Sequence, residues 1–133
     1  MKRTRKPLPL TTRASPAKAF RLPNIGVFEV ARFDVYRHPD AALRKKTPYL
    51  LDVQNDYIEG METRVVLPIR AASLFGLPMR DLNPLLEIDG SQVVLDAAAI
   101  AAFPAAELRN PVVNLRAQAD VIVNALDTLL GSY

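Results

Sequence analysis

From residue 31 onward, apolar and polar residues alternate in short runs, and this pattern predicts a chain built mostly of β-strands. Phe33 and Val35 alternate with polar neighbours, which is typical of a strand that is buried on one face. The runs 49–54 and 63–67 predict two further strands. Stretches that contain Pro, Gly, Asn and Asp separate the runs and indicate loops.

Proline and glycine mark where the next predicted elements end. Pro68 follows the third run, and we expect it to end that strand because proline donates no backbone hydrogen bond. Residues 70–75 predict one helical turn, which Gly76 then ends. The runs 85–88 and 91–95 flank an Asp-Gly pair, which favours the positive φ angles of a type I′ turn and predicts a β-hairpin.

One amphipathic helix is predicted near the C-terminus. Its apolar positions recur at spacings of four and three residues and form one stripe: Leu115, Ala119, Ile122, Leu126 and Leu129. We expect Asn114 to cap the start of this helix and Gly131 to end it in the left-handed conformation. Before the helix, residues 96–104 predict either a helical turn or an irregular crossover ending at a proline.

Short strands followed by one helix predict a mainly β fold, a small antiparallel barrel closed by a C-terminal helix. A domain over residues 31–133 accounts for this pattern, whereas residues 1–30 contain four prolines and no sustained period. We expect residues 1–30 to be a disordered extension. One interpretation is a basic arm that binds nucleic acid or a partner protein. The other is that these residues lie upstream of a translation start near Val30. The abrupt change of pattern favours the second interpretation.

The net charge of +3 is distributed unevenly along the chain. Residues 1–30 carry a net charge of +6, and residues 31–133 a net charge of −3. The domain therefore shows no sign of direct sequence-specific nucleic-acid binding. No apolar run is long enough to span a membrane, and the basic N-terminal segment lacks the apolar core of a secretory signal. We expect a cytoplasmic protein.

Composition also limits the chemistry. The chain has no cysteine, which excludes a disulfide scaffold, a thiolate metal site and a cysteine nucleophile. Its one histidine, His38, leaves no two-histidine metal site and disfavours a histidine-based triad; its place beside Pro39 predicts exposure in a loop. No glycine-rich phosphate loop is present. These features favour a binding protein without a cofactor over an enzyme.

Five stretches, taken in order, resemble the CcdB family of bacterial toxins. They are Arg32–Tyr36, Leu51–Asp56, Thr63–Ile69, Leu82–Ile88 and the terminal helix with Ile122, Asn124 and Ala125. The resemblance covers residues 31–133, with a short insertion near residues 38–46. It implies an SH3-like barrel of antiparallel strands, CcdB/MazF-like, with a C-terminal helix.

The resemblance also implies a function and its partners. The CcdB family supplies toxins of type II toxin–antitoxin systems, which serve plasmid maintenance. These toxins act as homodimers that bind the A subunit of DNA gyrase and trap the covalent cleavage complex with DNA. They perform no chemistry themselves and need no cofactor. A small antitoxin with a disordered tail, which folds on binding, neutralises them.

By this resemblance, the gyrase contacts lie in a loop and at the end of the chain. The positions are Tyr57, Ile58, Asn124, Asp127, Leu130, Gly131, Ser132 and Tyr133. Family members typically end in an aromatic residue followed by Trp-Gly-Ile, and here Gly131 replaces the large tryptophan anchor. Either Tyr133 supplies the missing aromatic two residues later, or the domain keeps the fold with a lost or changed target.

Apolar residues at the end of the helix also predict the oligomeric state. Leu129, Leu130 and Tyr133 exceed what one helix stripe can bury. In the CcdB family the C-terminal ends lie near the twofold axis of the dimer. We therefore expect a symmetric dimer that uses the end of the last helix.

Several residues allow two interpretations. In the predicted loop, Tyr57 and Ile58 form an exposed anchor, or Ile58 folds back onto the barrel. Asp52 and Asp56 are four residues apart, as an acid pair can be, but hydrogen bonding to turn amides is the favoured interpretation. The run 44–46 is basic and is interpreted as a solvated loop rather than a phosphate contact.

Two alternative functions remain open. Ribonucleases of the MazF family use the same barrel without a metal, and Arg64, Arg70 or Arg80 could neutralise a developing phosphorane there. The N-terminal pattern of that family is absent from this chain. The other alternative is a non-toxic relative that only binds an antitoxin-like partner.

Overall fold

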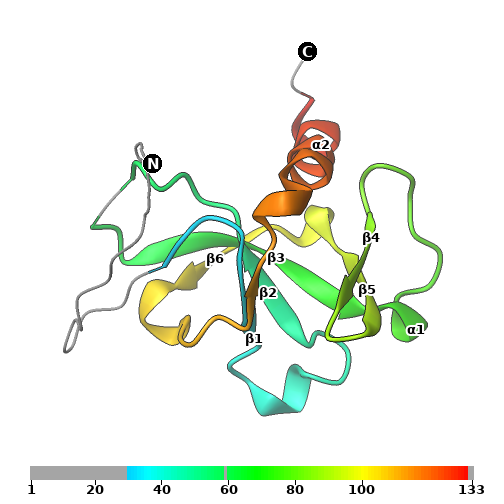
Figure 1. The fold of residues 1–133 in the computed structure, drawn as a ribbon, viewed down its shortest axis with the longest axis horizontal. Helices are drawn as coiled ribbons and strands as arrows, with labels where there is room; N and C mark the ends of the chain where they lie inside the picture. Colours follow the sequence, from blue (N-terminus) through cyan, green and yellow to red (C-terminus); the bar gives the residue numbers. More distant parts are fainter. Residues whose placement is uncertain (1–29, 59, 132–133) are drawn as a thin grey trace.

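A curled antiparallel sheet with one long helix is the architecture of this protein (Figure 1). The computed structural model describes residues 30–58 and 60–131. The strands are β1 Asp34–Arg37, β2 Tyr49–Asp52, β3 Thr63–Ala71, β4 Leu85–Ile88, β5 Ser91–Leu95, β6 Ala101–Pro104 and β7 Val113–Asn114. The helices are α1 Ala72–Phe75 and α2 Ala119–Leu130, with 3₁₀ turns η1 Ala41–Leu43, η2 Ala97–Ala99, η3 Ala105–Glu107 and η4 Arg116–Gln118. The predicted fold class is confirmed.

The long central strand β3 organises the sheet. The strand order is β4-β5-β3-β2-β1-β7, and β6 also pairs with β3. One edge of β3 pairs with β2, while the other edge pairs first with β6 and then with β5. This change of partner along one strand curls the sheet into a half-barrel.

The prediction that Pro68 ends the third strand is wrong, because β3 continues to Ala71. Pro68 is opposite Leu50 of β2, and its carbonyl accepts the backbone N–H of Asp96 at 2.9 Å. Within a strand, the nitrogen and carbonyl of one residue face the same neighbour. The nitrogen of Pro68 therefore faces away from β2, toward the junction between the β6 and β5 pairings. Its missing N–H leaves no acceptor of β2 without a bond.

Both faces of the central strands are buried, so the prediction of a one-sided first strand is wrong. The larger core contains Val35, Leu51 and Leu67 and packs against Ile122 and Ala125 of α2. A second core lies around Tyr36, which the alternating pattern had placed on a polar face. It consists of Tyr36, Leu50, Val66 and Leu108, with Val30 and Phe103 packed against them.

The predicted hairpin and helical turn are confirmed. Ile88 pairs with Ser91 across Asp89 and Gly90, whose φ angles are +52° and +78°. Two positive φ angles at the centre of a two-residue turn are the requirement of type I′. The turn α1 ends at Gly76, as expected from the sequence.

The segment before the last helix agrees with its prediction in part, because the helical turn is present as η2 at Ala97–Ala99. The strand β6, which pairs with β3, and the short strand β7, which pairs with β1, were not predicted. The helix α2 begins at Ala119, so Leu115 is buried outside it. The prediction that Asn114 caps this helix is wrong, because Gln118 is the N-cap residue and the Asn114 side chain instead accepts the Arg116 N–H at 2.8 Å. Gly131 ends α2 with a φ of +68°, as predicted.

The prediction of an exposed His38 is also wrong. Its ring packs edge-on against Phe103, with 6.0 Å between the ring centroids. Its Nδ1 accepts the backbone N–H of Asp40 at 3.0 Å. This burial lowers the pKa of His38. The strand that carries Phe103 was not predicted, and this is why the histidine was misplaced.

Some sequence predictions fall outside the described residues. The disordered extension, except Val30, and the tail residues Ser132 and Tyr133 lie there, so the boundary between residues 1–30 and 31–133 stays a prediction. Within the described ranges, no helix has the length and apolar character that a membrane span requires.

Candidate functional site

Three exposed apolar side chains lie in the loop between β2 and β3. Tyr57 is 88% exposed, Ile58 47% and Met61 55%. The structure therefore shows the exposed arrangement rather than Ile58 folded back onto the barrel. Met61 was missed by the sequence analysis, although an apolar residue within a polar loop is a usable signal. The binding role of these residues stays a prediction.

Asn55 shapes the loop immediately before Tyr57. Its side-chain oxygen accepts the backbone N–H of Tyr57 at 2.9 Å, and its carbonyl accepts that of Ile58 at 3.1 Å. An asparagine side chain that bonds to the backbone two residues later forms an Asx turn. The turn explains why the chain reverses here and leaves both apolar side chains in solvent.

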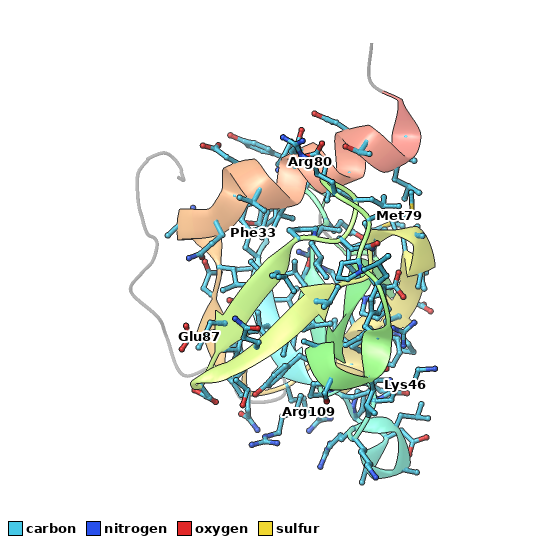
Figure 2. The ribbon with its side chains drawn as sticks, turned by 90° about the vertical axis from the view of Figure 1, so that its right-hand side faces the viewer. Phe33, Lys46, Met79, Arg80, Glu87 and Arg109 are labelled. Carbon is cyan, nitrogen blue, oxygen red and sulfur yellow. The ribbon has the colours of Figure 1, made fainter. Side chains whose placement is uncertain are left out.

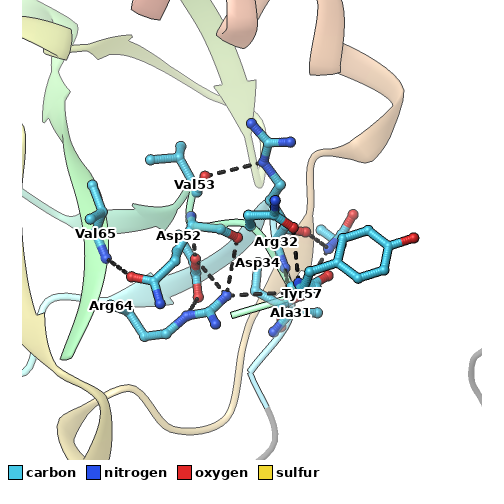
Figure 3. Close-up of polar contacts among 12 residues, drawn as sticks. Ala31, Arg32, Asp34, Asp52, Val53, Tyr57, Arg64 and Val65 are labelled. Atoms are coloured by element: carbon cyan, nitrogen blue, oxygen red, sulfur yellow. Dashed lines mark hydrogen bonds and ion pairs between the residues drawn. The ribbon is translucent and has the colours of Figure 1, made fainter. Parts of the chain in front are cut away.

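A buried ion pair lies beneath this loop. Arg64 Nε donates to Asp52 Oδ2 at 2.8 Å, and Arg64 Nη2 donates to Asp52 Oδ1 at 3.0 Å. The same Nη2 is 3.3 Å from the carbonyl of Gln54 and 3.3 Å from Asp56 Oδ1. Figure 3 shows the guanidinium between the Asp52 carboxylate and the loop, with the ring of Tyr57 pointing away from the pair. One arginine thus binds three residues of the segment that leads to Tyr57.

Burial dominates the electrostatics of this pair. It raises the pKa of Asp52 to about 6, although the hydrogen bonds and charge of Arg64 act in the opposite direction. Burial alone would lower the pKa of Arg64, but its bonds to Asp52 and Asp56 outweigh this effect and raise it. Both partners are therefore charged at neutral pH.

Part of this network agrees with the prediction from the sequence. Asp52 Oδ1 accepts the backbone N–H of Gln54 at 3.0 Å, which is the favoured turn-amide interpretation. Asp56 Oδ1 accepts the backbone N–H of Arg32 at 2.9 Å. The partner that was missed is Arg64, because the pattern within one strand does not show which charged side chain of the next strand reaches its carboxylate.

The helix residues assigned by resemblance lie on α2 and its end. Asn124 is exposed and has its Nδ2 3.4 Å from Asp81 Oδ1. The carbonyl of Asp127 accepts the Gly131 N–H at 2.8 Å, and Leu130 is 69% exposed. Where the chain is described, no hydrogen bond or ion pair joins Tyr57 or Ile58 directly to α2. The two halves of the assigned site therefore come from separate elements.

The three arginines of the ribonuclease alternative do not converge. Arg64 is engaged with Asp52, and Arg70 donates to Asp96 Oδ2 at 3.0 Å and to the hydroxyl of Thr47. These two arginines are six residues apart on β3, which corresponds to about 20 Å. Figure 2 places the third, Arg80, beside α2.

The basic run 44–46 is mostly solvated, as interpreted from the sequence. Lys45 and Lys46 are exposed, and Arg44 Nε donates to the His38 carbonyl at 2.6 Å. Lys46 lies at the end of the molecule opposite α2 (Figure 2). In the ranges described, no cluster of three His, Asp or Glu residues is arranged to hold a metal ion.

We expect Asp52 to titrate near pH 6, above its ordinary value of 3.8. The folded chain holds this proton more tightly than the unfolded chain, so the group favours folding most below about pH 4 and this contribution is lost as the pH rises to about 6. Carbon-13 NMR of the side-chain carboxyls measures the midpoint, and an Asp52→Asn variant identifies the signal. A midpoint at or below about 4 would contradict the burial effect.

Comparison with known proteins agrees with this architecture. Residues 32–131, most of the chain, match the family model described as CcdB protein. A search of individually curated proteins gives no match. The matched range contains the loop after β2, the buried ion pair and α2. The chain belongs to the CcdB family, a family of toxins from toxin–antitoxin systems.

Proposed function

We propose that this protein is a toxin that binds the A subunit of DNA gyrase and traps the gyrase–DNA cleavage complex. The observation that carries the proposal is the exposed Tyr57, presented on a loop that a buried ion pair holds from below. An exposed aromatic on an ordered support is typical of an interface anchor. Membership of the CcdB family supports the same target class.

The proposed contact surface has two parts. The loop part contains Tyr57 and Ile58, with Met61 beside them in sequence. The second part is the end of the chain: Asn124, Asp127, Leu130, Gly131, Ser132 and Tyr133. Because Gly131 replaces the family's tryptophan, the loop supplies the larger share of the anchoring in this proposal.

The remaining partners follow from the same proposal. A cognate antitoxin neutralises the toxin, the protein works as a homodimer without a cofactor, and it acts in the cytoplasm, where gyrase meets DNA. It cuts neither DNA nor RNA itself. The engaged Arg64 and Arg70 argue against a ribonuclease, because neither guanidinium is free to meet a phosphorane.

The proposed function first predicts a cleavage product of gyrase. Gyrase incubated with this protein, supercoiled DNA and ATP should give linear DNA after treatment with detergent and protease. Tyr57→Ala should weaken binding to the gyrase A subunit by about 2–4 kcal/mol, a factor of ~30 to ~1000, because a central anchor is lost. Isothermal titration calorimetry measures this loss.

A matched control is Leu77→Ala, which removes a side chain that is 92% exposed on a different loop. It should leave both binding and poisoning unchanged. Equal losses in the two variants would contradict the assignment of Tyr57. Cleaved RNA instead of linear DNA would favour the ribonuclease, and neither product would favour a relative that only binds a partner.

The tail provides a second prediction. Deleting Ser132 and Tyr133 should abolish poisoning if Tyr133 replaces the missing aromatic anchor, while the melting temperature stays within a few degrees of the parent. The fold should survive because α2 is already complete at Gly131. Poisoning by the truncated protein at the level of the full chain would show that the tail assignment is wrong.

The oligomeric state provides a third prediction. We expect sedimentation velocity at tens of micromolar to show a dimer, because the exposed Leu130 at the end of α2 gives a twofold interface an apolar contact. Leu130→Glu should shift the population toward monomer, since it would bring two carboxylates together at the axis. A monomer for the unmodified protein would contradict the proposed dimer.

A further inference from the structure

One carboxylate in the loop joins three separate segments. Asp56 Oδ1 accepts the backbone N–H of Arg32 at 2.9 Å and lies 3.3 Å from Nη2 of Arg64. Asp56 directly precedes Tyr57 in the chain. The bonds of Asp56 therefore fix the backbone next to Tyr57 relative to β3, through Arg64, and relative to the segment that enters β1, through Arg32.

The hydrogen bonds continue from Arg32 toward the last helix. Arg32 Nε donates to the Val53 carbonyl at 3.1 Å, and the Arg32 carbonyl accepts Nδ2 of Asn114 at 3.1 Å. Nδ2 of Asn114 also donates to Asp34 Oδ1 at 2.9 Å, and its Oδ1 accepts the Arg116 N–H at 2.8 Å. Arg116 begins η4, which leads into α2. A chain of bonds thus runs from the loop to the element that carries the second part of the proposed surface.

We expect Asp56 to affect the conformation of the loop more than the stability of the folded protein. Its side chain is about half exposed and packs in neither hydrophobic core. Exposed ion pairs stabilise folded proteins only weakly. By contrast, the orientation of Tyr57 depends on how the preceding residues are held, and Asp56 holds them on the side of the loop that faces the barrel.

We propose that Asp56 is a positioning residue for the target-binding loop. It keeps Tyr57 and Ile58 in their exposed arrangement through its bonds to Arg32 and Arg64, and it does not itself touch the target. An anchor that is ordered before binding loses less conformational freedom in the complex, so the order of the loop raises affinity. The effect on gyrase rests on the proposed function, whereas the ordering of the loop does not.

The first test measures the order of the loop without any target. The chain has no tryptophan, so Tyr57→Trp introduces a single fluorescent reporter at the anchor. In that background, Asp56→Ala should increase the fast component of the tryptophan anisotropy decay. Asp56→Asn, which keeps an oxygen acceptor, should restore most of the order. Glu87→Ala, which removes an exposed carboxylate from β4, is the matched control and should change nothing.

Thermal melting separates this effect from unfolding, since all three variants should melt within a few degrees of the parent. An anisotropy decay that Asp56→Ala leaves unchanged would overturn the positioning role. A large loss of melting temperature in both Asp56 variants would overturn it as well, because Asp56 would then be a structural residue.

The second test is a double-mutant cycle on the affinity for the gyrase A subunit. Asp56→Ala alone should weaken binding about tenfold to a hundredfold, but it should have little further effect in the Tyr57→Ala background. Additive losses would mean that Asp56 contacts the target directly and would overturn the proposal. If the unmodified protein does not bind gyrase, the proposed function fails, and the anisotropy measurement still decides the positioning role.

Discussion

The buried ion pair between Asp52 and Arg64 is the constraint on which the candidate site depends. Two charges removed from water cost free energy that their attraction alone does not offset, so such a pair needs good geometry and further hydrogen bonds. Here the guanidinium makes two bonds to the carboxylate, and the carboxylate also accepts the Gln54 N–H. Because an uncompensated charge would remain if either partner moved away, the end of β2 is held against the start of β3.

The curled sheet brings this pair to the base of the loop. β2 ends at Asp52 and β3 begins at Thr63, so the intervening residues leave the sheet at the point where the ion pair closes it. The change of partner along β3 then covers both faces of the central strands with separate cores. The loop thus connects two strands of the sheet and exposes the ring of Tyr57, an arrangement that suits contact with a partner.

Much of the fold follows from local signals in the sequence. The Asp-Gly turn and the left-handed Gly131 each depend on neighbouring residues only, and the structure agrees with both predictions. The short strands β6 and β7 were missed because an Ala-rich run and a two-residue strand carry almost no periodic signal. Pro68 and His38 were misjudged because their environments are set by strands distant in sequence.

The site was less predictable than the fold, and the reason is physical. Tyr57 and Ile58 are conspicuous as apolar residues in a polar loop, so the sequence allows their exposure to be predicted as one of two alternatives. The support beneath them joins Arg32, Asp56, Arg64 and Asn114 across four segments of the chain. Such a network depends on three-dimensional proximity, which no spacing within a single segment reveals.

The measurement that tests the role of the buried pair most directly is a double-mutant cycle on the free energy of unfolding in urea. Arg64→Met should lower the stability by about 3–5 kcal/mol, because it leaves Asp52 buried without its partner. The double variant Asp52→Leu with Arg64→Met should recover most of that loss, since no buried charge remains. A single Arg64→Met variant as stable as the unmodified protein would contradict the account.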